Sequence, residues 1–235
     1  MKSTYKYRIY PGKSQENKLE NTFSMCRHLY NWSLCERITS YQIWQSAKAI
    51  EKSLKNTIHS SSMGQVFYNE DKELPALNLL ISIEGIFGIQ ISSVWGNVPR
   101  KADYYSQADN LPELKKDRPW YKGVHSQVLQ NTLKRLDTAY KGFFNEGKGY
   151  PKYKKRGEWK SITYPQYKVH PDGNKISVSK IGELKIVYHR EIPKEAIIKT
   201  LTIEKDGDKW FACFSFEITH THIEHKQDLS KSIGI

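Results

Sequence analysis

Residues 197–218 read IIKTLTIEKDGDKWFACFSFEI, with the dipeptide Asp206-Gly207 between two alternating runs. Alternation of apolar and polar residues with a period of two is typical of β-strands, and Asp-Gly between two such runs indicates a tight hairpin turn. The stretch therefore predicts a β-hairpin. Its second strand should carry one apolar face, formed by Trp210, Ala212, Phe214, Phe216 and Ile218.

The same two-residue period recurs elsewhere in the chain. It appears in NKISVSK (174–180), in GELKIVYH (182–189) and near the N-terminus in residues 4–10. Pro11-Gly12 should end that first strand, because proline lacks a backbone donor and glycine favours turns. The N-terminal strand is expected to place Tyr5, Tyr7 and Ile9 on one face and Lys6, Arg8 and Tyr10 on the other.

Two segments between these strands have a helical period instead. We expect the first helix to begin near Ser14, as N-cap, and to reach about Ser40 or beyond. The second should start near Val124 and stop at Gly147 and Gly149. For residues 45–75 we expect a loop or an irregular helical excursion. The apolar run that follows, residues 77–95, cannot be assigned to a helix or a strand. The first helix has an apolar stripe of Leu19, Phe23, Cys26, Tyr30 and Leu34.

One early strand, helices and several late strands predict an α+β fold, a β-barrel interrupted by a helical insertion. The 235 residues carry 37 Lys and Arg against 25 Asp and Glu, so the formal charge of +12 favours an acidic partner, most often nucleic acid. Three cysteines without metal-type spacing indicate packing residues in a reduced, cytoplasmic protein. We expect no signal peptide and no membrane partner, because no apolar run is uninterrupted.

Residues 149–166, GYPKYKKRGEWKSITYPQ, form what we call the basic–aromatic segment, with five cations and one acid. Cations bind phosphates and aromatic faces stack on unpaired bases, so the mixture favours RNA or melted DNA over plain duplex. The alternative is a solvated loop whose rings cover the end of the barrel. The candidate contacts in this segment are Lys152, Tyr153, Lys154, Lys155, Arg156, Trp159, Lys160, Tyr164 and Gln166.

Other functional patterns are weaker. Arg27, Asn31 and Arg37 are candidates for a polar, nucleic-acid-binding face of the first helix, although an amphipathic stripe of this kind is more often core. The histidines of THTHIEH (219–225) match a metal site poorly, because no second ligand cluster lies near them in sequence. No arrangement of nucleophile and base is recognisable, so no catalytic residue is assigned.

Several ordered blocks resemble the transposon-encoded OrfB/TnpB family, and together they cover most of residues 4–44 and 111–218. They are YKYRIYPGKSQENKLENTFSMCRHLYNWSLCER, LPELKK, VHSQVLQNTLKRLDTAYKGFF, the basic–aromatic segment and GELKIVYHREIPKEAIIKTLTIEKDGDKWFACFSFEI. The resemblance implies a transposase-like, RNA-guided DNA endonuclease with a helix-turn-helix N-terminus. A wedge barrel (OB-like) and a helical recognition lobe would hold guide RNA and read double-stranded DNA beside the target.

On this resemblance, residues 1–10 are the first strand of the wedge barrel, 11–148 the recognition lobe and 149–220 the rest of the barrel. Residues 46–101 do not look like the family and form an atypical insertion, and 221–235 would be a linker. In the family a Gly-Ile pair leads into the first catalytic Asp of a RuvC-like nuclease, whose domain would use a divalent metal and zinc.

The sequence stops at Gly234-Ile235. We therefore expect a nucleic-acid-binding N-terminal half, truncated before that nuclease, with no cofactor of its own and no cleavage activity alone. The alternatives are one part of a split endonuclease with a separately encoded RuvC-like half, a decayed transposase remnant, or a helix-turn-helix DNA-binding protein.

Overall fold

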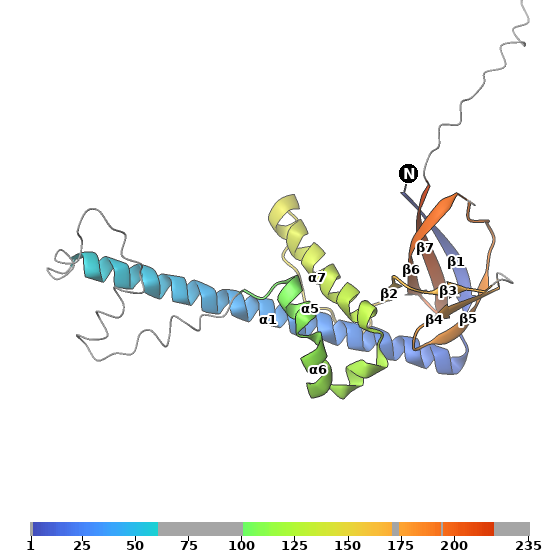
Figure 1. The fold of residues 1–235 in the computed structure, drawn as a ribbon, viewed down its shortest axis with the longest axis horizontal. Helices are drawn as coiled ribbons and strands as arrows, with labels where there is room; N and C mark the ends of the chain where they lie inside the picture. The colour runs from blue at the N-terminus through green and yellow to red at the C-terminus, as the bar shows by residue number, and fades with distance from the viewer. Residues whose placement is uncertain (1, 61–100, 171–173, 194, 219–235) are drawn as a thin grey trace, which may run out of the picture. The chain divides into compact units, whose positions relative to one another are not determined.

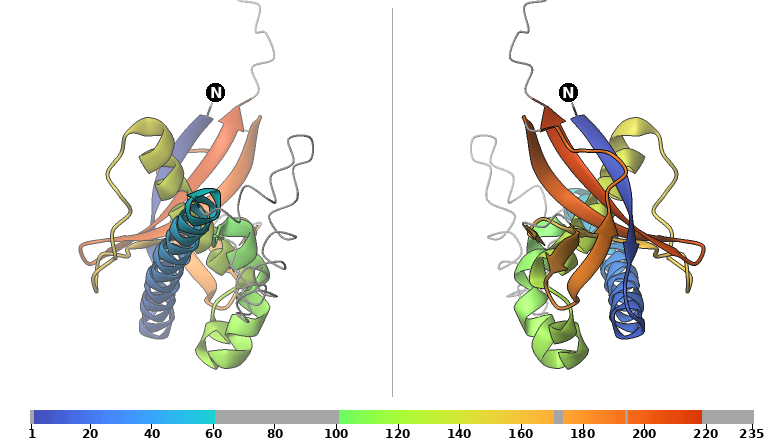
Figure 2. Two further views of the ribbon diagram at one scale, coloured as in Figure 1. Left: turned by 90° about the vertical axis from the view of Figure 1, so that its left-hand side faces the viewer. Right: turned by 90° about the vertical axis from the view of Figure 1, so that its right-hand side faces the viewer.

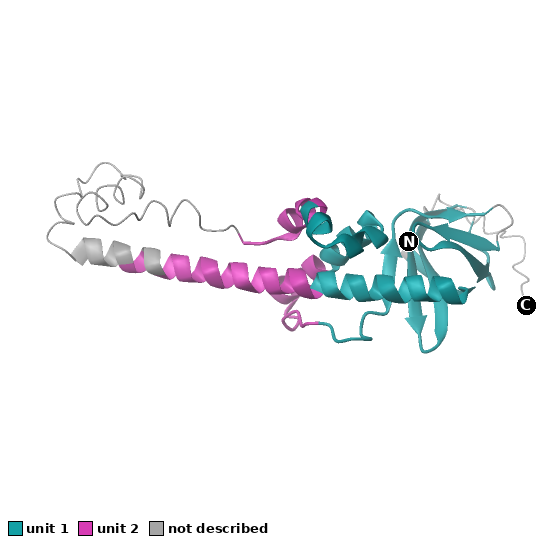
Figure 3. Ribbon diagram, turned by 90° about the horizontal axis from the view of Figure 1, so that it is seen from below, with its two compact units in different colours: residues 1–30, 113–135, 154–235 teal, residues 31–112, 136–153 magenta. Residues whose placement is uncertain are grey.

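The computed structural model describes residues 2–60, 101–170, 174–193 and 195–218, and the chain divides into two compact units (Figure 3). Unit 1 consists of residues 1–30, 113–135 and 154–235, and unit 2 of residues 31–112 and 136–153. The elements, labelled in Figure 1, are β1 (Lys2–Tyr10), α1 (Lys13–Ser60), α5 (Tyr104–Asp109), α6 (Leu111–Asp117), the 3₁₀ helix η1 (Pro119–Gly123), α7 (Ser126–Glu146), β2 (Ser161–Tyr164), β3 (Lys168–Val169), β4 (Lys175–Val178), β5 (Gly182–Val187), β6 (Ala196–Asp206) and β7 (Lys209–Ile218).

Unit 1 is built on an antiparallel sheet. Among the described residues its strand order is β2-β6-β7-β1-β5-β4-β3, and it curls into a half-barrel (Figure 2). The predicted hairpin is confirmed: Asp206 pairs with Lys209, and Gly207 takes the first position of the two-residue turn with a φ of 57°. Mixed helix and sheet confirm the α+β class. The closed, OB-like form of the barrel stays a prediction, because β2 and β3 stand at opposite ends of the order.

The core of unit 1 lies on one face of this sheet. Trp210, Ala212, Phe214 and Phe216 are buried as predicted, whereas Ile218 is only half-buried. Tyr7 and Ile9 of β1 face the same way, opposite Ala212 and Trp210.

The first part of α1 covers this core. The rings of Phe23 and Trp210 lie 5.6 Å apart, and the Trp210 Nε1 donates to Glu16 Oε1 at 3.2 Å. Lys205 Nζ pairs with Glu20 Oε1 at 2.5 Å. The predicted stripe of α1 is therefore confirmed as core, because Leu19, Phe23, Cys26, Tyr30 and Leu34 are all buried.

The start of α1 corrects the predicted cap. The Gly12 carbonyl accepts from the backbone N–H groups of Gln15 and Glu16, at 2.8 and 2.9 Å. The Gln15 side chain returns the bond, because its Oε1 accepts from the Gly12 N–H at 2.9 Å. Gly12 therefore occupies the N-cap position and Ser14 lies inside the first turn.

For residues 45–75 we expected a loop or an irregular helical excursion, and as far as Ser60 the structure shows a regular helix instead. Helix α1 continues without a break to Ser60. Residues 13–60 contain neither proline nor glycine, and residues 47–52 (AKAIEK) are mostly strong helix formers. The remainder of that expected loop, and the apolar run after it, lie outside the described residues.

Unit 2 contains the later part of α1 with α5 and the end of α7. Helix α5 begins at a reciprocal cap, in which the Ser106 N–H donates to Asp103 Oδ1 at 2.8 Å and the Asp103 N–H donates to Ser106 Oγ at 3.0 Å. Helix α7 ends at Glu146, directly before Gly147, as predicted. Among the cysteines, Cys26 of unit 1 is buried and Cys213 half-buried, but Cys35 of unit 2 is exposed, which corrects its expected packing role.

Candidate nucleic-acid interface

The backbone of the basic–aromatic segment connects α7 to β2 and contains one ordered turn in unit 1. The Glu158 N–H donates to the Lys155 carbonyl at 3.2 Å, and the Lys155 N–H donates to Glu158 Oε2 at 2.9 Å. Gly157 has a φ of 82°, which a residue with a side chain rarely adopts. Arg156 therefore lies at the tip of the turn, and the one acid of the segment binds backbone instead of neutralising a neighbouring side chain.

The cations of this segment are mostly exposed. In unit 1 the side chains of Lys155, Arg156 and Lys160 are exposed and that of Lys154 is half-buried, and in unit 2 Lys152 is exposed. Within the described parts of the chain, no ion pair joins Lys152, Lys155, Arg156 or Lys160 to an acid. Their charge is therefore not compensated by a direct contact with a described carboxylate.

The aromatic rings of the segment divide into two kinds. In unit 2, Tyr150 and Tyr153 are 44% and 52% exposed. In unit 1, Trp159 is buried against Tyr30 at a ring separation of 5.4 Å, and Tyr164 is buried within β2, which raises its pKa. Trp159 and Tyr164 were expected to contact nucleic acid from the surface. In the structure both rings pack inside unit 1 instead.

Arg135 of α7 holds this part of unit 1 together. Its Nη1 donates to the Ser161 carbonyl at 2.9 Å, its Nη2 donates to Thr163 Oγ1 at 2.9 Å, and its guanidinium lies 5.4 Å from the centre of the Trp159 ring. Burial lowers the pKa of Arg135. Sequence reasoning missed this residue. It lies off the apolar stripe of α7, and no local pattern distinguishes it from a surface arginine.

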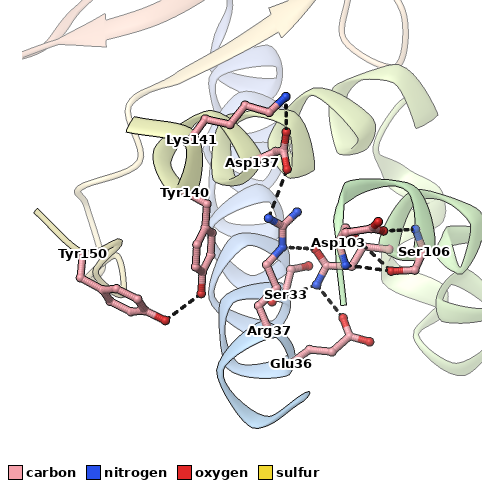
Figure 4. A network of polar contacts seen from close by, with 10 residues as sticks. Ser33, Glu36, Arg37, Asp103, Ser106, Asp137, Tyr140, Lys141 and Tyr150 are labelled. Atoms are coloured by element: carbon pink, nitrogen blue, oxygen red, sulfur yellow. Dashed lines mark hydrogen bonds and ion pairs between the residues drawn. The ribbon is translucent and has the colours of Figure 1, made fainter. Parts of the chain in front are cut away.

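The predicted residues of α1 lie in different surroundings. Arg27 in unit 1 and Asn31 in unit 2 are half-buried, whereas Arg37 is only 8% exposed in unit 2. Figure 4 shows the network of polar contacts around Arg37. The Arg37 Nε donates to Gln107 Oε1 at 2.9 Å, and its Nη1 contacts Asp137 Oδ1 at 3.3 Å. Arg37 therefore belongs to the interior of unit 2 and not to an exposed polar face, which corrects the prediction.

The network extends on both sides of Arg37. Gln107 Nε2 donates to the Ser33 carbonyl at 2.9 Å and to Glu36 Oε2 at 2.7 Å. Lys141 Nζ pairs with Asp137 Oδ2 at 3.0 Å. The side chains of three helices are thereby joined inside unit 2. Gln166, the last predicted contact, is exposed in unit 1 between β2 and β3.

A second group of cations and rings lies on the outward face of the sheet in unit 1. The Arg8 guanidinium lies 5.3 Å from the centres of both the Tyr10 and the Phe211 rings, and Lys6 Nζ lies 4.2 Å from the Phe211 centre. Lys6 also pairs with Glu204 at 2.6 Å. The alternation of residues 4–10 places Lys6, Arg8 and Tyr10 on this face, but only the strand pairing brings Phe211 beside them.

Metal ligation has no support in the part of the chain that the structure describes. Within residues 2–60, 101–170, 174–193 and 195–218, no three side chains of His, Cys, Asp or Glu come together as a metal site would require. The histidines of residues 219–225 lie outside these ranges. In the same ranges, none of the helices has both the length and the apolar character of a transmembrane span.

Comparison with known proteins finds one matching family model and two similar proteins that we report here. A model of a helix-turn-helix domain, HTH_OrfB_IS605, matches residues 1–43. The "Putative RNA-guided DNA endonuclease InsQ" of Escherichia coli (strain K12) is 32% identical over 117 residues, which are 48% of this chain and 29% of InsQ. A "Putative RNA-guided DNA endonuclease" of Streptomyces pristinaespiralis is 24% identical over 226 residues, 94% of this chain and 43% of that protein. The chain thus spans less than half the length of both relatives.

The local structure of the matched region differs from the description of the family model. Residues 2–43 form strand β1 and the first part of one uninterrupted helix, α1. A helix-turn-helix unit has two helices joined by a short turn, and its second helix enters the major groove. The match therefore shows sequence similarity to this family model. The structure of residues 2–43 is one strand followed by one continuous helix.

Proposed function

Because the chain belongs to the OrfB/TnpB family, we propose that its two units bind nucleic acid, namely a structured guide RNA and the duplex DNA that flanks a target. Both relatives carry names that describe RNA-guided DNA endonucleases. In systems of this kind, base pairing reads the sequence, and the protein contacts the backbone and a short flanking motif. We propose binding of these two partners as the role of the described residues.

The exposed cations of the basic–aromatic segment are the observation that carries this proposal. Lys155 and Arg156 project from a turn that is closed by the hydrogen bonds of Glu158. Because that carboxylate binds backbone, the two neighbouring cations keep their charge for a partner. Each phosphate that a Lys or Arg neutralises releases condensed counterions, which makes binding favourable and dependent on salt.

A charge-matched pair of triple variants tests the proposal. One variant carries Lys152→Gln, Lys155→Gln and Arg156→Gln. The control carries Lys18→Gln, Lys122→Gln and Lys209→Gln, which remove the same charge from three other exposed sites. We expect the first variant to reduce the slope of log K against log salt by about two to three, and the control by less than one. Equal losses in both variants would count against a defined site.

The identity of the RNA calls for a second experiment. The chain is purified from cells that carry the DNA flanking its gene, and the RNA that accompanies it is sequenced. The proposal expects one defined, structured transcript, enriched over the variant that lacks the three cations of the basic–aromatic segment. Background RNA of equal amount in both samples would overturn guide binding.

A duplex-DNA binder of the helix-turn-helix class is the second candidate, and the description of the matching family model favours it. It predicts tighter binding to duplex DNA than to structured RNA of equal length. The continuous helix formed by residues 13–60 argues against it, because no turn within that range presents a separate recognition helix. Competition between the two nucleic acids for one labelled probe separates the candidates.

A further inference from the structure

Four aromatic rings gather at the C-terminal end of α7 in unit 2, and we call them the aromatic platform: Tyr140, Phe143, Phe144 and Tyr150. The rings of Tyr140 and Phe144 are stacked with an interplanar angle of 22° and a separation of 6.2 Å. Phe143 contacts Phe144 and Tyr150 edge to face, at 5.0 and 5.1 Å. The four rings therefore form one continuous group and not a set of scattered apolar residues.

The platform is open on one side. Phe144 is 70% exposed and Tyr150 is 44% exposed. A single exposed apolar side chain is ordinary, but a contiguous group of rings on a charged protein indicates a contact surface. Exposed aromatic rings such as those of Phe144 and Tyr150 are suited to contact with a flat, uncharged group such as a nucleobase.

The rings are also held in place before any partner arrives. The Tyr140 and Tyr150 hydroxyls are hydrogen-bonded at 2.9 Å (Figure 4). The Arg37 guanidinium lies 5.1 Å from the centre of the Tyr140 ring, and Arg37 is itself fixed by Asp137 and Gln107. Because neighbouring side chains already orient Tyr140, little side-chain freedom remains to be lost when a base stacks on the platform.

Charge identifies the occupant. Exposed lysines lie in the same stretch of sequence as the rings: Lys141 pairs with Asp137, Lys148 pairs with Glu146, and Lys152 is exposed. A second copy of a chain with net charge +12 would be repelled by this surface, whereas a polyanion would be attracted. Duplex DNA keeps its base faces stacked inside, so a polyanion that also offers flat faces is single-stranded.

We propose that Phe144 and Tyr150 stack on unpaired bases of a bound single strand, so that the platform is a binding site separate from the cations of the turn at residues 155–158. The inference rests on the proposed function, because it names which part of the bound nucleic acid meets this surface. The phosphates on either side of the stacked bases would lie near Lys148 and Lys152, which are close to Tyr150 in sequence.

The test uses Phe144→Ala with Tyr105→Ala as its matched control. Tyr105 is 74% exposed in the same unit but contacts only Tyr104 among the aromatic contacts described. The probes are a mixed-sequence single-stranded oligonucleotide carrying 2-aminopurine, whose fluorescence is quenched by stacking, and a blunt duplex of the same length. We expect Phe144→Ala to weaken single-strand binding about fivefold or more and to relieve part of the quenching.

The control and a conservative variant complete the design. Tyr105→Ala and Phe144→Tyr should bind the single strand like the unmodified chain, and Phe144→Ala should leave duplex binding and the melting temperature unchanged. Equal losses for Phe144→Ala and Tyr105→Ala, or equal losses on both probes, would overturn the platform. Loss of binding in the triple variant of the basic–aromatic segment, with no effect of Phe144→Ala, would leave the proposed function standing and remove this inference.

Self-association is measured on the same samples. If sedimentation equilibrium detects a dimer that Phe144→Ala dissociates, while single-strand binding is unchanged, the platform is a protein contact and the inference is wrong. If the unmodified chain binds neither single strand nor duplex nor structured RNA, the proposed function and the platform fall together.

Discussion

Arg135 and Arg156 each follow a lysine in the sequence, and both belong to unit 1, yet their surroundings are opposite. Arg135 is half-buried and donates to the Ser161 carbonyl and the Thr163 hydroxyl, and its ring neighbour is Trp159. Arg156 lies at the tip of a turn, exposed and without a described carboxylate partner. Arg135 therefore joins a helix to a strand, whereas Arg156 is exposed and can meet a polyanion.

The comparison shows why counts of basic residues overestimate a binding surface. A guanidinium carries five donors, and an interior position can use several of them on backbone and hydroxyl oxygens. Arg37 in unit 2 repeats the pattern of Arg135, since Gln107 accepts from its Nε and Asp137 accepts from its Nη1. Which arginines bind nucleic acid thus depends on which acceptors the fold brings to them.

The largest effect should come from replacing the half-buried Arg135. We expect Arg135→Ala to lower the free energy of unfolding by about 3 kcal/mol, because the Ser161 carbonyl and the Thr163 hydroxyl lose a charged donor and Trp159 loses its neighbour. Arg156→Ala should change it by less than about 0.5 kcal/mol, as is usual for an exposed side chain. Urea unfolding of both variants measures the difference, and similar losses would contradict the contrast.

The next effect sharpens the other half of the comparison. Arg156→Gln should reduce the slope of log K against log salt by about one, because one phosphate contact is lost. At moderate salt the affinity for RNA should fall about tenfold or less. Arg135→Lys, which keeps the charge inside unit 1, should leave the salt slope unchanged. A loss of slope in Arg135→Lys as large as that in Arg156→Gln would mean that the interior arginine also reaches the ligand.

The smallest effect concerns a buried and an exposed thiol on α1. Burial raises the pKa of Cys26 in unit 1 to about 11, whereas Cys35 in unit 2 is exposed. Because the pKa of Cys26 is higher in the folded state than in the unfolded state, ionisation of this thiol destabilises the fold. The free energy of unfolding is therefore unaffected below about pH 9 and falls as pH rises toward 11. By pH 10 we expect Cys26 to have cost roughly 1 kcal/mol of unfolding free energy.

Unfolding at pH 8 and pH 10, in the unmodified chain and in Cys26→Ala, isolates this contribution. The variant should lose less stability between the two pH values, although Cys213, whose pKa burial raises to about 11, and Tyr7, whose pKa burial raises to about 12, add to the fall in both proteins. At pH 8 a thiol reagent should modify Cys35 quickly and Cys26 only on unfolding. Fast modification of both thiols in the native state would contradict the burial of Cys26.

Much of the fold was predictable from local pattern. The alternation around Asp206-Gly207 predicts the β6–β7 hairpin, and the stripe of α1 predicts its buried face, because period and side-chain direction are coupled in strands and helices. Cap and length were less predictable. Gly12 instead of Ser14 caps α1. The helix continues to Ser60 because the stretch contains no helix breaker, but its weak apolar pattern did not predict a helix there.

Less of the candidate site followed from sequence. The basic–aromatic segment was recognisable by its composition. Most of its cations are exposed, as a phosphate-binding segment requires. Its rings did not behave alike: Tyr153 is exposed, but Trp159 lies against Tyr30, and Arg135 was not recognised at all. The partners of Trp159 and Arg135 come from helices or strands well separated in sequence, and no local pattern carries that information.

By itself the sequence determined the period of each strand and helix, the turn chemistry at Gly207, the net charge of +12 and the resemblance to a family. Tertiary structure alone decided which cations are occupied and which are exposed, and which rings are core and which form the platform at Phe144. The physical reason is that charge and aromatic character belong to a residue, whereas burial and hydrogen-bond partners belong to the space that distant segments share.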